Sequence, residues 1–214
     1  MDLEVQEDTN INFHIMRGAL ITFYGINNIG KTTQSQLLVK RLQAEGVDAV
    51  FVKFPIYDTE PTGPFLNRVL RESDGRVQKI PEEELQMWFA LNRFQFESTL
   101  VKWLEEGKIV IAEDYTGTGI GWGTAKGADQ DWLENLNRYL LKEDFAILLE
   151  GARTMKAKEA DHIHESNDEL VERAREVFSR LADEYGWMRV QMDAVKEASA
   201  EKIYTVVKNF LSMR

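Results

Sequence analysis

Glycine, lysine and threonine residues near the N-terminus are spaced as in a loop that binds nucleotide phosphates. Residues 25–32 read GINNIGKT and match the Walker A pattern G-x-x-x-x-G-K-[ST]. The glycines let backbone N–H groups converge on phosphate oxygens, Lys31 brings a charge to the β and γ phosphates, and the Thr32 hydroxyl is an oxygen ligand for Mg²⁺. We expect Lys31 to be solvated until a nucleotide binds. The motif predicts a nucleoside triphosphate site formed by Gly25, Asn27, Asn28, Ile29, Gly30, Lys31, Thr32 and Thr33.

The segments on either side of this motif fit the setting that such a loop requires. Residues 19–24 are apolar enough for a buried strand, and residues 31–44 carry apolar side chains at helical spacing. A helix that starts at Lys31 points its N-terminus, with its partial positive charge, at the bound phosphates. Since a chance match would rarely fall between a strand and a helix, the sequence indicates a phosphate-binding loop.

Two adjacent acids, Glu113 and Asp114, follow a second apolar run at residues 109–112. In parallel sheets, functional side chains gather at the carboxyl ends of the strands. Carboxylates at the end of a buried strand are costly unless they have a partner such as Mg²⁺ or an arginine. We therefore predict that both acids belong to the catalytic site and that one of them helps Thr32 to hold a metal ion. A solvated strand end is the alternative.

Phe89 and Arg93 share one face of a helix predicted from Pro81 to Glu106, because they are four residues apart. An aromatic ring and a guanidinium one turn apart can stack on a base and bond its edge or a phosphate. Taken alone, Phe89 fits a core residue and Arg93 a surface ion-pair partner. Residues 116–123, TGTGIGWG, hold four glycines, which indicates either backbone lying against a ligand or a flexible loop.

Strands and helices alternate along the chain, which predicts an α/β fold with a central parallel sheet and helices on both faces. Further strands are expected at residues 47–53, 145–150 and 187–192, and further helices at 64–71, 131–141, 167–185 and 198–211. We expect one domain, residues 18–214, after a polar lead-in at residues 1–17.

The composition argues against several classes of protein. The 214 residues include no cysteine, so disulfides and thiolate metal sites are impossible. There is no apolar run of about 18 residues that could form a transmembrane helix. The formal net charge is −10, without the dense basic cluster that is typical of nucleic-acid-binding proteins. We expect a cytoplasmic protein that acts on a small molecule, with neither membrane nor nucleic acid as a partner.

Five segments together resemble the thymidylate kinases: GINNIGKTTQ, KFP, FALNR, EDYTGTGIGWGTAKG and MDA. Their order and spacing are more specific than the Walker motif, and the resemblance runs from about residue 19 to the C-terminal helix. It implies a P-loop kinase fold with a small lid at about residues 151–167. It also implies transfer of a phosphoryl group from ATP to dTMP with Mg²⁺, and a homodimer.

The resemblance also implies roles for individual residues. Phe89 takes the place of the aromatic that stacks on thymine, Arg93 contacts the base or phosphate, and Trp122 lies under the deoxyribose, where it disfavours a 2′-hydroxyl. Glu113 occupies the family's acid position and is the expected metal partner, and Arg153 in the lid is expected to stabilise the transferred group. The other expected contacts are Asp193 and Ala194 near adenine, and Asn27, Lys53, Phe54, Tyr57, Thr118 and Gly119 near the acceptor.

Several positions depart from the family pattern. Asn27 stands where the family has an acid, and Tyr57 and Asp114 stand where it has arginines that hold phosphate. The basic residues that can replace the lost charge are Lys53, Arg68, Arg71, Arg153, Lys156 and Lys158. Two alternatives therefore remain beside a dTMP kinase. One is a deoxynucleoside kinase acting on free thymidine or a related nucleoside, and the other is a regulator that only binds nucleotide.

Overall fold

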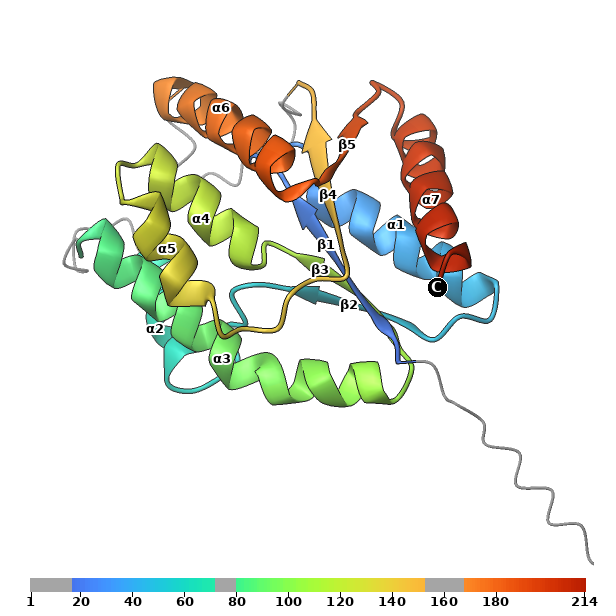
Figure 1. The fold of residues 1–214 in the computed structure, drawn as a ribbon, viewed down its shortest axis with the longest axis horizontal. Coiled ribbons are helices and arrows are strands. Elements are labelled where there is room, and N and C mark those ends of the chain that lie inside the picture. The colour runs from blue at the N-terminus through green and yellow to red at the C-terminus, as the bar shows by residue number, and fades with distance from the viewer. Residues whose placement is uncertain (1–16, 72–79, 153–167) are drawn as a thin grey trace, which may run out of the picture.

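A five-stranded, fully parallel sheet forms the centre of the molecule (Figure 1). The computed structural model describes residues 17–71, 80–152 and 168–214. The strand order is β2-β3-β1-β4-β5, with bounds β1 Ala19–Tyr24, β2 Ala49–Lys53, β3 Ile109–Glu113, β4 Phe145–Glu150 and β5 Met188–Gln191. The predicted α/β fold with a central parallel sheet is confirmed.

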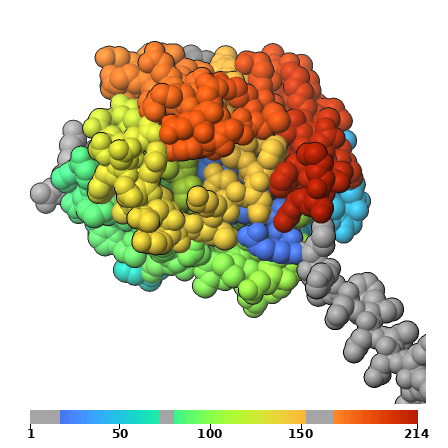
Figure 2. Space-filling model, in the orientation of Figure 1, coloured from blue at the N-terminus to red at the C-terminus, as the bar shows by residue number. Residues whose placement is uncertain are grey.

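Helices cover both faces of the sheet, as the alternating pattern predicts. One face carries α1 (Lys31–Ala44) and α7 (Lys196–Ser212). The other face carries α3 (Glu82–Glu105), α4 (Thr116–Ala125), α5 (Gln130–Asn137) and α6 (Asp168–Tyr185), while α2 (Thr62–Arg71) packs against α3. Figure 2 shows how little of β1 remains visible once these helices and the segment before β4 are drawn with their side chains.

The two central strands are buried along their whole length, which agrees with their largely apolar sequences. Every residue of β1 and of β3 is buried, as expected for strands covered on both faces. The parallel register places Phe23 and Lys53 opposite Glu113. The phosphate loop, the end of β2 and the acids after β3 therefore meet at one edge of the sheet.

The glycine-rich stretch is a helix, so the expectation of a flexible loop was wrong, although Thr118, Gly119 and Trp122 of this stretch line the cavity described below. Residues 116–125 form α4, although glycine is a poor helix former. Tertiary packing explains this. A Cβ at Gly117 would lie 2.7 Å from Trp187, and one at Gly121 would lie 2.5 Å from Phe178. The glycines let α4 approach its neighbours closely, and this burial outweighs the poor intrinsic helix propensity.

Other element boundaries shift by a few residues. The helix expected at 131–141 ends at Asn137, and the strand expected from residue 47 starts at Ala49. The helix expected at 64–71 begins at Thr62. Residues 1–16 of the lead-in and residues 153–167 of the predicted lid lie outside the described residues. Among the residues that are described, no helix is long and apolar enough to cross a membrane.

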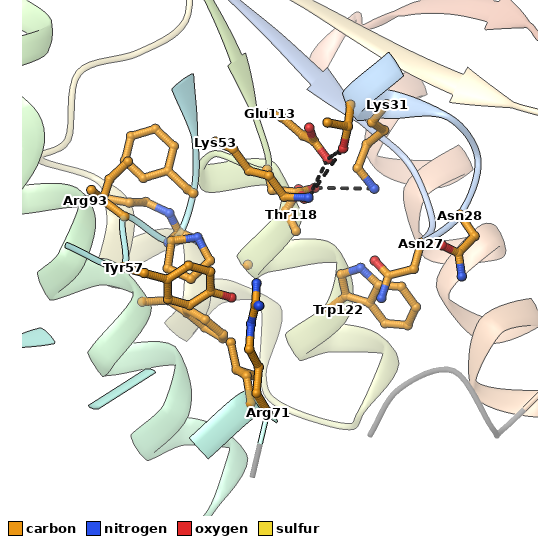
Figure 3. A pocket seen from close by; sticks show the side chains of 18 of the residues that line it. Asn27, Asn28, Lys31, Lys53, Tyr57, Arg71, Arg93, Glu113, Thr118 and Trp122 are labelled. Carbon is orange, nitrogen blue, oxygen red and sulfur yellow. Dashed lines mark hydrogen bonds and ion pairs between the residues drawn. The ribbon is translucent and has the colours of Figure 1, made fainter. Parts of the chain in front are cut away.

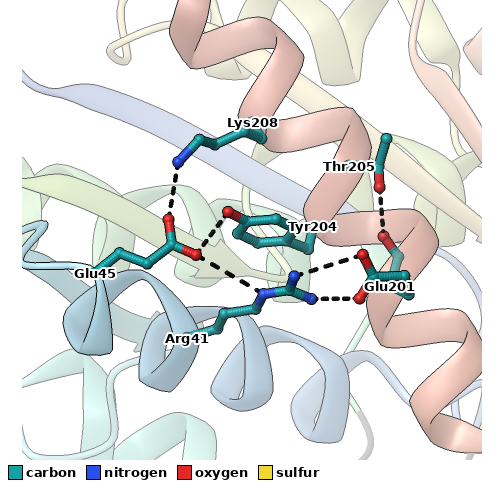
Figure 4. Close-up of polar contacts among 6 residues, drawn as sticks. All are labelled: Arg41, Glu45, Glu201, Tyr204, Thr205 and Lys208. Carbon is teal, nitrogen blue, oxygen red and sulfur yellow. Dashed lines mark hydrogen bonds and ion pairs between the residues drawn. The ribbon is translucent and has the colours of Figure 1, made fainter.

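A network of charged residues joins α1 to α7 on the surface (Figure 4). The Arg41 guanidinium lies 3.4 Å from the centre of the Tyr204 ring and forms an ion pair with Glu201. Tyr204 donates a hydrogen bond of 2.6 Å to Glu45, whose other oxygen accepts one of 2.8 Å from Lys208. The helix that starts at the phosphate loop is thereby tied to the C-terminal helix.

Candidate active site

A cavity of about 820 Å³ lies at the carboxyl ends of β1, β2 and β3 (Figure 3). Its wall combines the phosphate loop, the segment after β2, one face of α3 and the start of α4. Most of the predicted site residues line it together: Asn27, Asn28, Gly30, Lys31, Thr32, Thr33, Lys53, Phe54, Tyr57, Phe89, Arg93, Glu113, Asp114, Thr118, Gly119 and Trp122.

The phosphate loop has backbone angles that few residue types tolerate. Gly25, Asn28 and Gly30 have φ values of 132°, 63° and 103°. A side chain at Gly25 would also collide with the Leu149 carbonyl oxygen, 2.7 Å from the Cβ position. Asn28 can adopt its left-handed conformation because the short side chain of asparagine makes this region accessible. The sequence therefore fixes the turn from which α1 begins.

Lys31 is buried rather than solvated, contrary to our expectation. Only 5% of its surface is exposed, and its ammonium donates hydrogen bonds to the carbonyl oxygens of Gly25 and Ile26, at 2.8 and 3.0 Å. Asp114 Oδ1 lies 3.4 Å away as its ion-pair partner. Because an ammonium has three donors, the loop satisfies it with carbonyl and carboxylate oxygens when no phosphate is bound.

Glu113 is a buried carboxylate, which rules out a solvated strand end. Its Oε1 accepts a hydrogen bond from Thr32 Oγ1 at 2.8 Å and lies 3.1 Å from the Lys53 ammonium. Its Oε2 is buried and has no hydrogen-bond partner among the described residues. Burial, followed by the neighbouring Asp114 charge, raises the pKa of Glu113.

Thr32 and Glu113 are suited to holding Mg²⁺. Both offer hard oxygen atoms, and the unpaired Glu113 Oε2 needs a cation or a donor such as a metal-bound water. Within residues 17–71, 80–152 and 168–214, no three His, Cys, Asp or Glu side chains cluster as a metal site. Phosphate oxygens and water would have to complete the coordination, as is usual for Mg²⁺ bound with a nucleotide.

Asp114 stands where the resemblance implies an arginine, and the structure shows how its negative charge is balanced. Its backbone is left-handed, with φ 63°. Its carboxylate faces Lys31 and accepts a hydrogen bond of 3.1 Å from Thr118 Oγ1. The repulsion between Asp114 and a bound phosphate is therefore reduced by a lysine that belongs to the phosphate loop.

Arg93 is buried in the wall of the cavity, so the expectation of a surface ion pair was wrong. It is 3% exposed, and its Nη1 donates a hydrogen bond of 2.9 Å to Asn137 Oδ1 in α5. Burial lowers the pKa of Arg93 to about 10, which leaves it charged at neutral pH. Phe89 lines the same wall one helical turn earlier. Trp122 lines the cavity from α4, and its ring packs edge-on against Phe178, with 6.2 Å between the ring centres.

Some predicted site residues lie elsewhere. Gly25 and Ile29 support the phosphate loop without lining the cavity, and Asp193 and Ala194 lie in the turn between β5 and α7. Arg153, Lys156 and Lys158 lie outside the described residues. Of the two basic candidates in α2, Arg71 lines the cavity, with its guanidinium 4.9 Å from the Tyr57 ring centre, whereas Arg68 does not.

Sequence reasoning missed Gln86 and Lys126, which also line the cavity. A signal for Gln86 was available, because it lies three residues before Phe89 and shares its helix face. Lys126 follows α4, and the interpretation of residues 116–123 as a loop concealed its position.

The phosphate loop is shared by many enzymes, whereas the cavity wall that faces it provides what an acceptor nucleotide needs. Aromatic side chains for a base and cations for a phosphate lie in the same cavity as Lys31 and Thr32. This arrangement, on a parallel sheet covered by helices, defines a nucleotide kinase of the P-loop class. The family model for thymidylate kinase matches residues 23–203. The chain belongs to the thymidylate kinase family, whose members are nucleoside monophosphate kinases.

Individual relatives agree with this assignment. A probable thymidylate kinase of Pyrococcus abyssi is 31% identical over 204 residues, which cover 92% of this chain and 98% of the relative. The thymidylate kinase of Schizosaccharomyces pombe is 28% identical over 201 residues, which cover 92% of this chain and 92% of the relative. A solved thymidylate kinase structure from Candida albicans superposes with a TM-score of 0.73 over 91% of this chain, at 20% identity, and supports the fold.

Proposed function

We propose that this enzyme transfers the γ-phosphoryl group of ATP to dTMP, giving dTDP. The observation that carries the proposal is the single cavity in which the phosphate loop faces Phe89, Arg93 and Trp122. Phosphoryl transfer needs alignment and charge neutralisation more than covalent chemistry. A cavity that holds donor phosphates and acceptor base together provides that alignment.

The chain's residues divide the work as follows. Lys31 exchanges its loop carbonyl partners for the β and γ phosphates of ATP, assisted by the loop amides. Thr32 and Glu113 would hold Mg²⁺, which would neutralise charge on the phosphates. Asp193 and Ala194 face the adenine, and the lid with Arg153 closes over ATP and excludes water. These last two assignments rest on the family resemblance.

The acceptor phosphate requires positive charge that the family arginines at positions 57 and 114 would have supplied. Lys53 stands at the end of β2, and Arg71 reaches the cavity from α2 beside Tyr57. We assign the acceptor phosphate to these two cations, and the base to Phe89 and Arg93. Trp122 lies under the sugar.

A deoxynucleoside kinase is the second candidate, and the observation that favours it is the presence of Tyr57 and Asp114 at the two arginine positions. Two other observations oppose it. The first is that the relatives matched over most of this chain are named as thymidylate kinases or probable thymidylate kinases. The second is that Arg71 and Lys53 line the cavity and supply positive charge there.

An Arg93→Ala variant tests the proposed function. Hydrogen bonds to charged groups contribute roughly 1.5–3 kcal/mol each, so we expect the KM for dTMP to rise about tenfold or more and that for ATP to change far less. Arg93→Lys keeps the charge and serves as a second variant if the alanine protein does not fold. Arg68→Ala, on α2 outside the cavity, is the control. A wild-type enzyme that phosphorylates thymidine and ignores dTMP would refute the proposal.

We also propose that the enzyme is a homodimer that pairs through α3. Four apolar side chains form an exposed stripe along this helix: Met87, Leu91, Phe94 and Val101, which are 48%, 46%, 38% and 37% exposed. Such a stripe is unusual for a monomer surface and typical of an interface. Light scattering measures whether the native protein is a dimer and whether Leu91→Glu, which places a charge on the stripe, is a monomer. A native monomer would refute the proposal. A cytoplasmic location and the absence of a nucleic-acid partner stay predictions.

A further inference from the structure

Gln86 is a buried amide in the wall of the cavity for which the proposed function has no role. It is 2% exposed and lies on α3 one turn before Phe89. Two glycines of α4 make room for it. A Cβ at Gly119 would lie 2.9 Å from Gln86 Oε1 and 2.8 Å from Arg93 Nη2, and one at Gly123 would lie 3.4 Å from Gln86 Cδ. The amide oxygen and the guanidinium therefore both lie against the Gly119 position.

Glu82 and Lys126 determine the orientation of the Gln86 amide. Gln86 Nε2 donates a hydrogen bond of 2.8 Å to Glu82 Oε1, and the other oxygen of Glu82 pairs with the Lys126 ammonium at 2.8 Å. An ionised carboxylate can only accept hydrogen bonds, so it selects the NH₂ end of the amide. The Gln86 Oε1 is left without a hydrogen-bond partner among the described residues.

Arg93 is oriented in a similar way from the other side. Asn137 Nδ2 donates a hydrogen bond of 2.8 Å to the Leu133 carbonyl oxygen, which leaves Asn137 Oδ1 to accept from Arg93 Nη1. The guanidinium is held in place, and Nη2 lies beside Gly119. The wall thus holds one oriented acceptor and one oriented donor close to the same position, Gly119.

We propose that Gln86 determines which pyrimidine the enzyme accepts, an inference that rests on the proposed function. Its Oε1 accepts the ring N3–H of thymine while Arg93 donates to the adjacent O4 carbonyl. Cytosine presents the opposite pattern, an unprotonated N3 and an N4 amino donor, and would leave both protein groups unpaired. The oxygen exposes less than 1 Å² to solvent, so a base reaches it through a small shift of the Gln86 side chain that keeps the hydrogen bond from Nε2 to Glu82.

The test is the ratio of kcat/KM for dTMP to that for dCMP, measured in wild-type enzyme, Gln86→Met and Glu82→Gln. Gln86→Met keeps the side-chain length and removes the acceptor. We expect the ratio to fall roughly tenfold, the loss of about one buried hydrogen bond, with the KM for ATP unchanged. In Glu82→Gln, Lys126 keeps the side-chain oxygen at position 82, because an ammonium can only donate, and the NH₂ group therefore faces Gln86. This turns the Gln86 amide round, so the ratio falls in this variant too. The analogue dTMP methylated at N3 should be rejected by the wild-type enzyme more strongly than by Gln86→Met.

Gln95→Met is the matched control, because Gln95 lies on the same helix and bonds to Thr62 and the Glu60 backbone outside the cavity. An unchanged dTMP to dCMP ratio in Gln86→Met would overturn the inference, and an unchanged ratio in Glu82→Gln alone would overturn the orienting role of Glu82. Failure of the proposed function is distinguishable, because the wild-type enzyme would then not use dTMP. In that case the same ratio, read with thymidine and deoxycytidine, decides the role of Gln86.

Discussion

At the scale of single residues, the cavity contains charges that compensate one another before any nucleotide binds. Lys31 faces Asp114, and Lys53 lies between Glu113 and the Thr32 hydroxyl, 3.1 and 3.4 Å away. Buried charges without partners are expensive, so these pairs allow the site to exist without its ligand. When a nucleotide binds, Lys31 exchanges its loop carbonyl partners for phosphate oxygens under the proposed function.

Replacing Lys31 with alanine is expected to have two effects. Turnover falls by orders of magnitude, because the donor phosphates lose their cation. Stability also falls, by about 1–3 kcal/mol, because Asp114 loses its partner and two loop carbonyls lose a donor. A coupled assay of ADP release and urea denaturation measure the two effects. Near-normal turnover would contradict the phosphate-loop assignment, and unchanged stability would contradict the structural role of the buried ammonium.

At the scale of elements, α4 shows how packing decides a helix that composition disfavours. Its glycines face Trp187, Phe178, Arg93 and Leu133. They set how closely α3, α5 and α6 approach, and therefore where Trp122 and the Gln86 amide lie in the cavity wall.

Gly121→Ala tests this role. Alanine is the better helix former by about 1 kcal/mol, yet its Cβ would lie 2.5 Å from the Phe178 ring. Overpacking costs about 1–3 kcal/mol, so we expect a net loss of stability in urea denaturation. The loss should shrink in a Phe178→Leu background, because the smaller side chain gives way. If the stability losses of Gly121→Ala and Phe178→Leu simply add in the double variant, the contact between these two residues does not limit the packing of α4.

At the scale of the whole molecule, the network of Arg41, Glu45, Glu201, Tyr204 and Lys208 ties α1 to α7 (Figure 4). The hydrogen bond from Lys208 lowers the pKa of Glu45, and that from Arg41 lowers the pKa of Glu201. A carboxyl group whose pKa is lowered by folding stabilises the protein above its unfolded pKa. That stabilisation is lost as the pH falls through the folded pKa.

Arg41→Met should therefore lower the melting temperature most at neutral pH and low salt. The difference from wild type should shrink in high salt, through screening, and as the pH falls below the usual range of glutamate. Thermal melts across pH and salt measure this. Arg180→Met is the control, because Arg180 makes a 3.7 Å ion pair with Glu184 within α6 and does not join two elements. A difference from wild type that is independent of pH and salt would mean that lost packing on Tyr204 dominates.

The sequence by itself determined the features that depend on neighbouring residues. Eight consecutive residues predict the phosphate loop. Apolar runs predict β1 and β3, because a strand covered by helices on both faces buries nearly all of its side chains. The gathering of functional side chains at the carboxyl ends of the strands follows from the alternating pattern, which predicts parallel strands. The five segments also indicated the family, which the comparison confirmed.

Only the tertiary structure decided the features that depend on distant packing. The helical state of residues 116–125, the burial of Lys31 and Arg93, and the place of Gln86 in the cavity wall all require α3, α4 and α5 to meet. Local propensity favoured a loop at α4 and solvent around both cations. The free energy gained by packing glycine backbone against aromatic rings, and by giving each buried cation an oxygen partner, reversed those preferences.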